Sequence, residues 1–408
     1  MELSLFLFVL LSLTAPLLVQ SHHQEPNNGA HVFNVFHYGA VGDGRADDTQ
    51  AFTDAWKATC MSSSSSPTMH IPWEKTFLLQ PLIFRGPCQS KNVHVEINGK
   101  IVAPSDPSKW KCNHSYCNKW IKFVRVDGLS ISGSGTIDGQ GSRWWDLSCG
   151  HNEHVRLVTL YKLQSFPIGN ETVYLSIANC MHFGIFLFFQ GCLVAPTGFV
   201  IAHSNNVHLS GLIFMDSPNM HIFFERSTGI YASNLSITAP GNSPNTDGIH
   251  IQKCTNVFID HSQIGTGDDC ISISDGSSHI NISRIVCGPG HGISIGSLGK
   301  GGNEETVEYV HVSDVEFRGT SNGVRIKTWQ KSAVRISNVT YSEIYGTSNR
   351  NTAVWFACSE SVPCTDIFVK NINIQSTENG EETWSYCQNA YGRVHGEVVP
   401  MVPCLDRR

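Results

Sequence analysis

The chain has 408 residues, a formal net charge of −6 and 15% charged residues, below the roughly 25% of an average soluble domain. The negative balance gives no overall attraction for nucleic acid, so none is expected as a partner, and an anionic substrate would need a local basic cluster. The low charge and the 36 glycines favour stacked strands with tight turns over a bundle of helices.

The chain begins with an apolar segment that predicts a secretory signal peptide at residues 1–21. Leu3–Val19 is almost entirely apolar, and Pro16 with the polar stretch that follows makes a membrane anchor the weaker alternative. We therefore expect residues 22–408 to form a single secreted domain, extracellular or in the cell wall, with no membrane attachment after cleavage.

Fourteen cysteines and five Asn-X-Ser/Thr sequons fit an oxidising secretory route, in which disulfides and N-linked glycans form. A disulfide-bonded glycoprotein is therefore expected. The sequons begin at Asn113, Asn170, Asn234, Asn281 and Asn338.

A short helix is predicted near the start of the secreted chain. Asp47 and Asp48 precede apolar residues at helical spacing, and the pair superficially resembles two catalytic carboxylates. Helix capping and compensation of the helix dipole explain it better. The apolar residues are Ala51, Phe52, Ala55 and Trp56.

A strand pattern recurs through the second half of the chain and predicts the fold. Each copy opens on a β-branched residue and continues with apolar residues at alternate positions. Successive copies begin 23, 27, 23, 30, 24 and 33 residues apart. This period indicates an all-β solenoid, best a right-handed parallel β-helix, because a β-propeller needs about 40 residues per blade. The opening residues are Val207, Ile230, Val257, Ile280, Val310, Val334 and Ile367.

Acidic and histidine motifs lie within this repeat. Asp247 and Asp268 are 21 residues apart, and Asp269 and His291 are 22 apart, so a β-helix would bring them together from successive coils. Clustered carboxylates raise the pKa of one member, which supplies an acid beside ionised bases, as glycoside hydrolysis requires. The alternatives are a structural ladder of Asn and Asp at coil turns and a divalent metal site.

A basic pair follows in the segment GVRIKTWQ. Arg325 and Lys327 are two residues apart, so on a strand they point to the same face. Arg presents a planar fork and Lys a point charge, which together suit a carboxylate on a sugar ring. Two cations beside the carboxylates argue against a metal ion, so we expect no metal.

The motifs NTDG, GDDC, GHG and RIK, in this order and spacing, resemble the polygalacturonases of glycoside hydrolase family 28, over about residues 33–154 and 191–404. The segments FNVFHYGAVGDGRADDTQAF and CSESVPC are similar to those of plant members. The resemblance implies a right-handed, pectin-lyase-like parallel β-helix without a cofactor, and we expect a monomer. It further implies inverting hydrolysis of α-1,4-galacturonosyl bonds in homogalacturonan. A hydrolase of rhamnose-containing pectin is disfavoured by GHG and RIK.

The resemblance also implies roles at matching positions. Asp268 would be the general acid, and His291 would tune or share its proton. Asp247 and Asp269 would activate the attacking water.

Binding residues and disulfides are implied in the same way. Asn245 would line the cleft, and Arg325 and Lys327 would hold the substrate carboxylate. The implied disulfides are Cys60–Cys88, Cys149–Cys192, Cys270–Cys287, Cys358–Cys364 and Cys387–Cys404.

Two segments depart from the family pattern. Residues 155–190 have no counterpart, and their ends can be encoded by splice-site sequences, so we hypothesise a retained intron of 36 codons. A genuine loop over the cleft is the alternative. One coil of the family, which carries a cleft-lining Tyr, is missing after residue 330. These departures leave open a second function, a catalytically impaired or inactive relative that binds wall polysaccharide.

Overall fold

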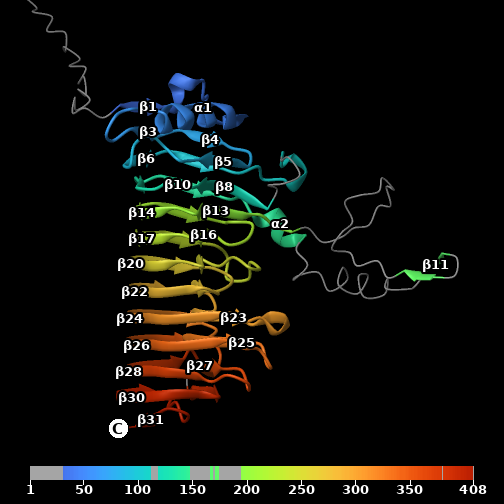
Figure 1. Ribbon diagram of the computed structural model, residues 1–408, viewed down its shortest axis with the longest axis vertical. Coiled ribbons are helices and arrows are strands. Elements are labelled where there is room, and N and C mark those ends of the chain that lie inside the picture. Colours follow the sequence, from blue (N-terminus) through green and yellow to red (C-terminus); the bar gives the residue numbers. More distant parts are fainter. Residues whose placement is uncertain are drawn as a thin grey trace, which may run out of the picture.

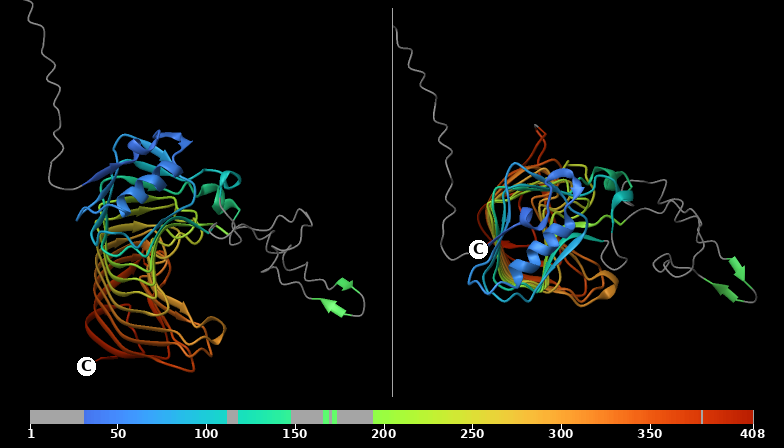
Figure 2. Two further views of the ribbon diagram at one scale, coloured as in Figure 1. Left: turned by 45° about the horizontal axis from the view of Figure 1, so that its top comes forward. Right: turned by 90° about the horizontal axis from the view of Figure 1, so that it is seen from above.

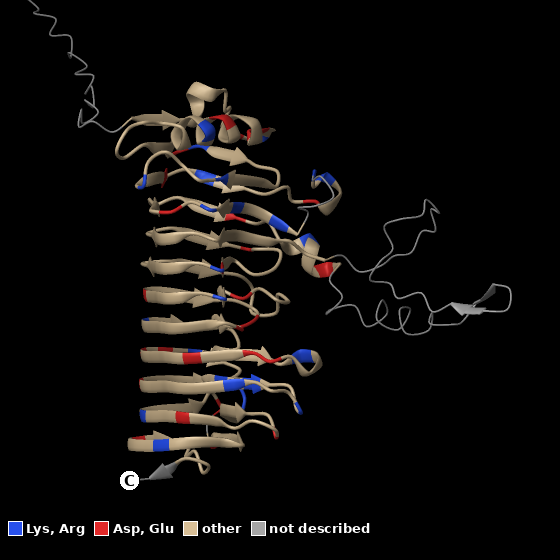
Figure 3. Ribbon diagram, viewed as in Figure 1, with Lys and Arg blue, Asp and Glu red and all other residues tan. Residues whose placement is uncertain are grey.

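The strands stack one above another in a parallel β-helix, in which each coil lies on the preceding one (Figure 1). This confirms the fold predicted from the repeat. Lys, Arg, Asp and Glu residues are sparse along the coils (Figure 3). The computed structural model describes residues 31–111, 118–147, 166–168, 171–173, 194–378 and 380–407.

Two large sheets make up the walls of the helix within the described residues. The ten-stranded sheet contains β5 (Leu82–Arg85), β8 (Lys119–Val124), β13 (Thr197–Ala202), β16 (Ile222–Glu225), β19 (Ile249–Gln252), β21 (Ile271–Ile273), β23 (Ile293–Leu298), β25 (Val324–Thr328), β27 (Thr352–Ala357) and β29 (Trp384–Gln388). The nineteen-stranded sheet contains β1 (Val32–Asn34), β2 (Asp43–Asp47), β3 (Thr68–Ile71), β4 (Thr76–Leu78), β6 (Val93–Ile97), β7 (Lys100–Val102), β9 (Leu129–Ser132), β10 (Thr136–Asp138), β14 (Asn205–Ser210), β15 (Ile213–Met215), β17 (Thr228–Ser233), β18 (Ser236–Thr238), β20 (Thr255–Gly265), β22 (Ser277–Cys287), β24 (Thr306–Thr320), β26 (Arg335–Ser348), β28 (Cys364–Ser376), β30 (Ala390–Val399) and β31 (Asp406–Arg407).

The remaining elements are short. Two strands, β11 (Phe166–Ile168) and β12 (Glu171–Val173), pair antiparallel with each other. The helices are α1 (Thr49–Cys60), α2 (Ser142–Asp146), η1 (Val35–Tyr38), η2 (Pro107–Lys109) and η4 (Lys300–Gly302). Among the described residues, none of these helices has the length and apolar character needed to span a membrane.

Apolar side chains fill the interior at the same position of each coil. In the ten-stranded sheet, Ile249, Ile271, Ile293, Val324 and Val354 pair in register on successive strands, and all are buried. Burial of apolar surface contributes about 25 cal/mol per Å², so every coil stabilises the coils above and below it. The residues between these positions point outward, because side chains alternate along a strand.

The repeat differs from the prediction at one coil. We expected Val334 to be equivalent to Val310, but the structure pairs Val310 with Val339, and Val339 with Ile367. These two coils are therefore 29 and 28 residues long, instead of the expected 24 and 33. Val334 is buried just before β26. A β-branched residue followed by alternating apolar positions occurs twice in this segment, and only the register distinguishes the two.

Asn or Asp residues recur on some coils at a corner of the nineteen-stranded sheet. Asn206, Asn256, Asn338 and Asp366 precede the aligned β-branched residues, with φ values of 55°, 56°, 55° and 55°. Asn and Asp adopt this left-handed conformation more readily than other non-glycine residues. The coils between them carry Gly229, His279 and Tyr309 at the same position, also with positive φ, so these residues do not form a continuous ladder.

The helix α1 covers the N-terminal end of the stack, as the end-on view shows (Figure 2). It lies where the sequence predicted a helix, with Phe52, Ala55 and Trp56 buried. The capping prediction was wrong for Asp48, whose carboxylate instead accepts hydrogen bonds from the backbone N–H of Val41 (2.6 Å) and Gly42 (3.2 Å). The carboxylate thus holds the preceding turn against the start of the helix.

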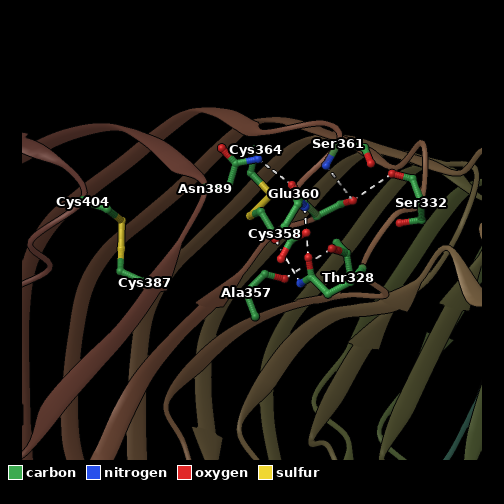
Figure 4. Close-up of a disulfide and its surroundings, with 12 residues drawn as sticks. Thr328, Ser332, Ala357, Cys358, Glu360, Ser361, Cys364, Cys387, Asn389 and Cys404 are labelled. Carbon is green, nitrogen blue, oxygen red and sulfur yellow. Dashed lines mark hydrogen bonds between the residues drawn. A yellow bond between two sulfur atoms is a disulfide. The ribbon is translucent and has the colours of Figure 1, made fainter.

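Four of the five expected disulfides lie in the described part of the chain, and the structure forms all four: Cys60–Cys88, Cys270–Cys287, Cys358–Cys364 and Cys387–Cys404. The last two lie near the C-terminal end of the stack (Figure 4). Cys149 and Cys192 lie outside the described residues. Cys254 is the free cysteine among the described ones, and it is buried.

The stack is continuous across residue 330, where we expected a coil of the family to be missing. The Gln330 side chain donates to the carbonyl of Cys358 (3.4 Å) and accepts from the N–H of Glu360 (3.0 Å). The hydroxyl of Ser359 donates to the carbonyl of Ser332 (2.9 Å), and this junction is drawn in Figure 4. The two coils thus contact each other directly. The signal peptide at 1–21 and, apart from β11 and β12, the segment 155–190 lie outside the described residues.

Candidate active site

Successive strands of the ten-stranded sheet bring the predicted site residues together. Asp247, Asp269 and His291 each lie two residues before a strand, namely β19, β21 and β23. Ile249, Ile271 and Ile293 pair in register at the starts of these strands, so the three polar residues occupy equivalent positions on adjacent coils. Arg325 and Lys327 follow on β25, the next strand.

Asp269 is the centre of a buried network of charges. Its Oδ1 accepts hydrogen bonds from the Ser294 hydroxyl (2.7 Å) and from Nη2 of Arg325. Its Oδ2 accepts from Nζ of Lys327 at 3.2 Å. Nε of Arg325 donates in turn to the Ser294 hydroxyl at 3.0 Å. Only 3% of Asp269 is exposed, so its charge is balanced by two cations rather than by water.

Asp268 and His291 form a second pair that is open to solvent. Nδ1 of His291 lies 2.9 Å from Oδ1 of Asp268, and the two side chains are 37% and 25% exposed respectively. Burial raises the pKa of Asp268, but the hydrogen bond and positive charge of His291 outweigh it, and the net effect lowers the pKa below its ordinary value. Without substrate, Asp268 is therefore an ionised carboxylate.

Asp247 is the carboxyl that binds a proton most readily in this cluster. Its pKa is raised to about 6, chiefly by burial and also by the negative charges of Asp269 and Asp268. A hydrogen bond with Nδ1 of His250, at 3.2 Å, opposes the increase. The expectation that clustering raises one pKa thus agrees with the structure. However, burial is the larger cause, and the raised pKa is that of Asp247 and not that of Asp268, the acid implied by the resemblance.

Three polar residues of the site were missed by sequence reasoning. His250 contacts Asp247, and Ser294 connects Asp269 to Arg325. His221 is buried beneath them, where its Nδ1 donates to the main-chain carbonyl of Asp247 at 3.1 Å. Burial lowers the pKa of His221 to about 4, which keeps it neutral. No motif marks these residues, and only the register between coils could have identified them.

Asn245, expected to line the cleft, lies in the turn two residues before Asp247. It is exposed and adopts a left-handed conformation, with φ of 55°. Asn tolerates this conformation well, so the turn brings the buried Asp247 and the exposed Asn245 close together in the chain.

A metal ion is a poor fit to this arrangement. Asp268, Asp269 and His291 offer ligand atoms within 4.8 Å of one another. However, the oxygens of Asp269 already accept hydrogen bonds from Arg325 and Lys327. A divalent cation would have to displace or repel these two positive charges. Arg325 and Lys327 are instead placed so that they can bind a second anion in addition to Asp269.

Comparison with known proteins identifies the family. The sequence model of glycosyl hydrolases family 28 matches residues 60–186, 188–345 and 330–396. A "Probable polygalacturonase" of Arabidopsis thaliana is 38% identical, over 92% of this chain and 81% of that protein. A "Polygalacturonase" of Chamaecyparis obtusa is 36% identical, over 94% of this chain and 74% of that protein.

Solved structures share the fold. The endo-xylogalacturonan hydrolase of Aspergillus tubingensis superposes with a TM-score of 0.68, at 21% identity, and the match covers 92% of this chain and 93% of that one. The polygalacturonase of Erwinia carotovora ssp. carotovora gives 0.63 at 20% identity, with 95% and 99% covered. Both likenesses support the parallel β-helix, and at such identities they say nothing about the substrate of this chain.

Proposed function

This chain belongs to the glycosyl hydrolases of family 28, and on that basis we propose that it hydrolyses α-1,4 bonds between galacturonates in pectin with inversion of configuration. One observation carries the proposal: three carboxylates and a histidine meet on adjacent strands beside Arg325 and Lys327. Acid and base carboxylates perform glycoside hydrolysis, and the two cations suit a substrate that carries a carboxylate on each sugar.

In this proposal, Asp268 protonates the oxygen of the leaving sugar. Its partial exposure and its contact with His291 place it where a substrate can approach. Asp247 and Asp269 orient and deprotonate the water that attacks the opposite face of the sugar ring. An inverting reaction needs an acid and a base separated by room for that water.

Substrate binding raises the pKa of Asp268, which is ionised in the free site. A uronate carboxylate that binds Arg325 and Lys327 draws both cations away from Asp269 and adds a negative charge nearby. Both changes raise the pKa of the neighbouring carboxyl groups. Asp268 therefore takes up a proton from solvent and becomes an acid when a uronate is bound. A neutral sugar would not produce this change.

The protein would act outside the cell as a monomer. The four disulfides support an oxidising compartment, together with the apolar segment at 1–21 and the sequons at Asn234, Asn281 and Asn338. The substrate is then the homogalacturonan of the cell wall, and no metal or cofactor takes part in the reaction.

The test is release of reducing ends from polygalacturonate, followed in wild type and in Asp268→Asn. We expect a loss of at least about 10²-fold in the variant, because general acid catalysis contributes about 10²–10⁴-fold. The matched control is Asp366→Asn, at an exposed corner where Asn is equally suited to the left-handed backbone. The first product should appear as the β-anomer by NMR.

Two results would contradict the proposal. Release of the α-anomer would exclude inversion. Binding of polygalacturonate by wild type with no release of reducing ends would instead identify an inactive relative that binds wall polysaccharide.

A further inference from the structure

Two aromatic rings lie just beyond the basic pair on the outer face of the ten-stranded sheet. Trp355 on β27 pairs in register with Arg325, and Tyr386 on β29 pairs in register with Trp355. In-register neighbours of a parallel sheet point to the same face. Val354 and Phe356, which flank Trp355, are both fully buried in the interior, so Trp355 must point outward.

The two rings form a stacked pair. Their centroids are 4.5 Å apart and their planes differ by 22°. Because β27 lies between β25 and β29, Tyr386 covers the face of Trp355 that is directed away from the catalytic residues. The other face of the indole is directed toward Arg325. Tyr386 thus supports the orientation of the indole. A stacked aromatic pair is stabilised by more than the burial of its apolar surface alone.

The two strands before β25, which carries Arg325, have small side chains at this position of the sheet. Ser272 on β21 pairs with Ser294 on β23, which pairs with Arg325, and both serines are buried. The outer face of the sheet is therefore shallow beside the carboxylates, and the side chain of Trp355 projects beyond it. A sugar chain lying over the serines would reach the indole one ring after the uronate bound by the cations.

We propose that Trp355, supported by Tyr386, is a sugar-stacking subsite for the galacturonate next to the one whose carboxylate binds Arg325 and Lys327. The proposal rests on the function proposed above and deepens it. The apolar C–H face of a pyranose ring packs against the indole, while its carboxylate stays on the side of the cations. The subsite selects polymers of rings over single uronates.

The experiment measures kcat and KM on galacturonate oligomers of two to six units, for wild type, Trp355→Ala, Trp355→Phe and Tyr386→Ala. In Trp355→Ala we expect KM for the longer oligomers to rise about tenfold with kcat changed less than about twofold, because stacking energy is lost from bound substrate and transition state alike. Trp355→Phe should retain most of the affinity, and Tyr386→Ala should give an intermediate effect.

The matched control is Trp384→Ala. Trp384 lies on the same strand as Tyr386 but is 49% exposed and lines a different hollow, with Val399 and Met401. We expect its KM to equal that of wild type. Circular dichroism spectra and melting temperatures establish that each variant is folded, and Trp355→Phe keeps the test valid if Trp355→Ala does not fold.

The outcomes separate this inference from the proposed function. If wild type hydrolyses the oligomers but the KM values of Trp355→Ala and Trp384→Ala agree, the subsite is disproved and the function stands. If wild type binds without hydrolysis, dissociation constants from calorimetry replace KM, and an unchanged constant in Trp355→Ala disproves the subsite. If wild type neither binds nor hydrolyses the oligomers, both proposals fail.

Discussion

The two faces of the ten-stranded sheet follow opposite rules. Toward the interior, each strand repeats nearly the same residue, and Ile249, Ile271 and Ile293 are all buried. Toward the outside, consecutive strands carry different residues at one position: His250, Ser272, Ser294, Arg325, Trp355 and Tyr386. Inner side chains must fit those of the coils above and below, whereas outer side chains are not held to that packing. The stack can therefore vary its chemistry coil by coil without altering its core.

The largest expected effect is on the outer side, in Asp269→Asn. Loss of this charge removes a base and releases Arg325 and Lys327 from their buried partner. We expect activity on polygalacturonate to fall about 10³-fold or more. Asp314→Asn, at an exposed left-handed corner, is the control and should keep full activity. Activity of Asp269→Asn above a tenth of wild type would place the catalytic carboxylates elsewhere.

The next effect is on the inner side, where two neighbouring residues of β21 allow a direct comparison. Ile273→Ala opens a cavity in the interior and should lower the free energy of unfolding by about 2–5 kcal/mol. Ser272→Ala, on the outer face of the same strand, should change it by less than about 1 kcal/mol. Chemical denaturation followed by circular dichroism measures both. Equal losses in the two variants would show that the faces do not differ as described.

A third prediction concerns Asp247, where the needs of catalysis and of folding conflict. Its pKa is raised from 3.8 to about 6, mainly by burial. Between these values the folded protein holds a proton that the unfolded chain has released, so the free energy of unfolding falls as the pH rises. Asp247→Asn should therefore stabilise the protein at pH 7, by on the order of 1–3 kcal/mol, and have little effect near pH 3.5.

Melting temperatures of wild type and Asp247→Asn across this pH range provide the measurement. The exposed Asp366→Asn variant should show no such pH-dependent gain. A stabilisation of Asp247→Asn that does not change with pH would mean that the pKa of Asp247 is the same in the folded and the unfolded chain. Activity should be lost in Asp247→Asn at every pH, since the amide cannot accept a proton from water.

The smallest effect concerns a polar group on the inner side. Tyr341 lies in register with Val312 and Val369, and its buried hydroxyl has no hydrogen-bond partner among the described groups. Tyr341→Phe removes the cost of burying this hydroxyl and should raise the free energy of unfolding by about 1 kcal/mol. Tyr345→Phe, which loses an exposed hydrogen bond to Glu343, should change it by less than about 0.5 kcal/mol. A destabilised Tyr341→Phe would reveal a partner for the hydroxyl.

Much of the site was predictable because the β-helix converts sequence period into distance. Asp247 and Asp269 are 22 residues apart, as are Asp269 and His291, and the structure places all three at equivalent positions on adjacent coils. The roles of these residues stay predictions, as do the signal peptide, the retained intron and the missing coil. Elsewhere the coils vary from 23 to 30 residues in length, so spacing in the sequence does not fix which residues align. The prediction that Val334 aligns with Val310 was wrong for this reason.

The sequence by itself determined the all-β repeat and the acidic and basic motifs. These properties follow from alternation along a strand and from residue types, which are local. Only the tertiary structure decided that Trp355 stands beside Arg325, because their pairing depends on the length of every turn between them. It also decided that Asp247 is the carboxyl whose pKa is raised. The pKa of a buried carboxyl reflects all its neighbours, and most of these come from other coils.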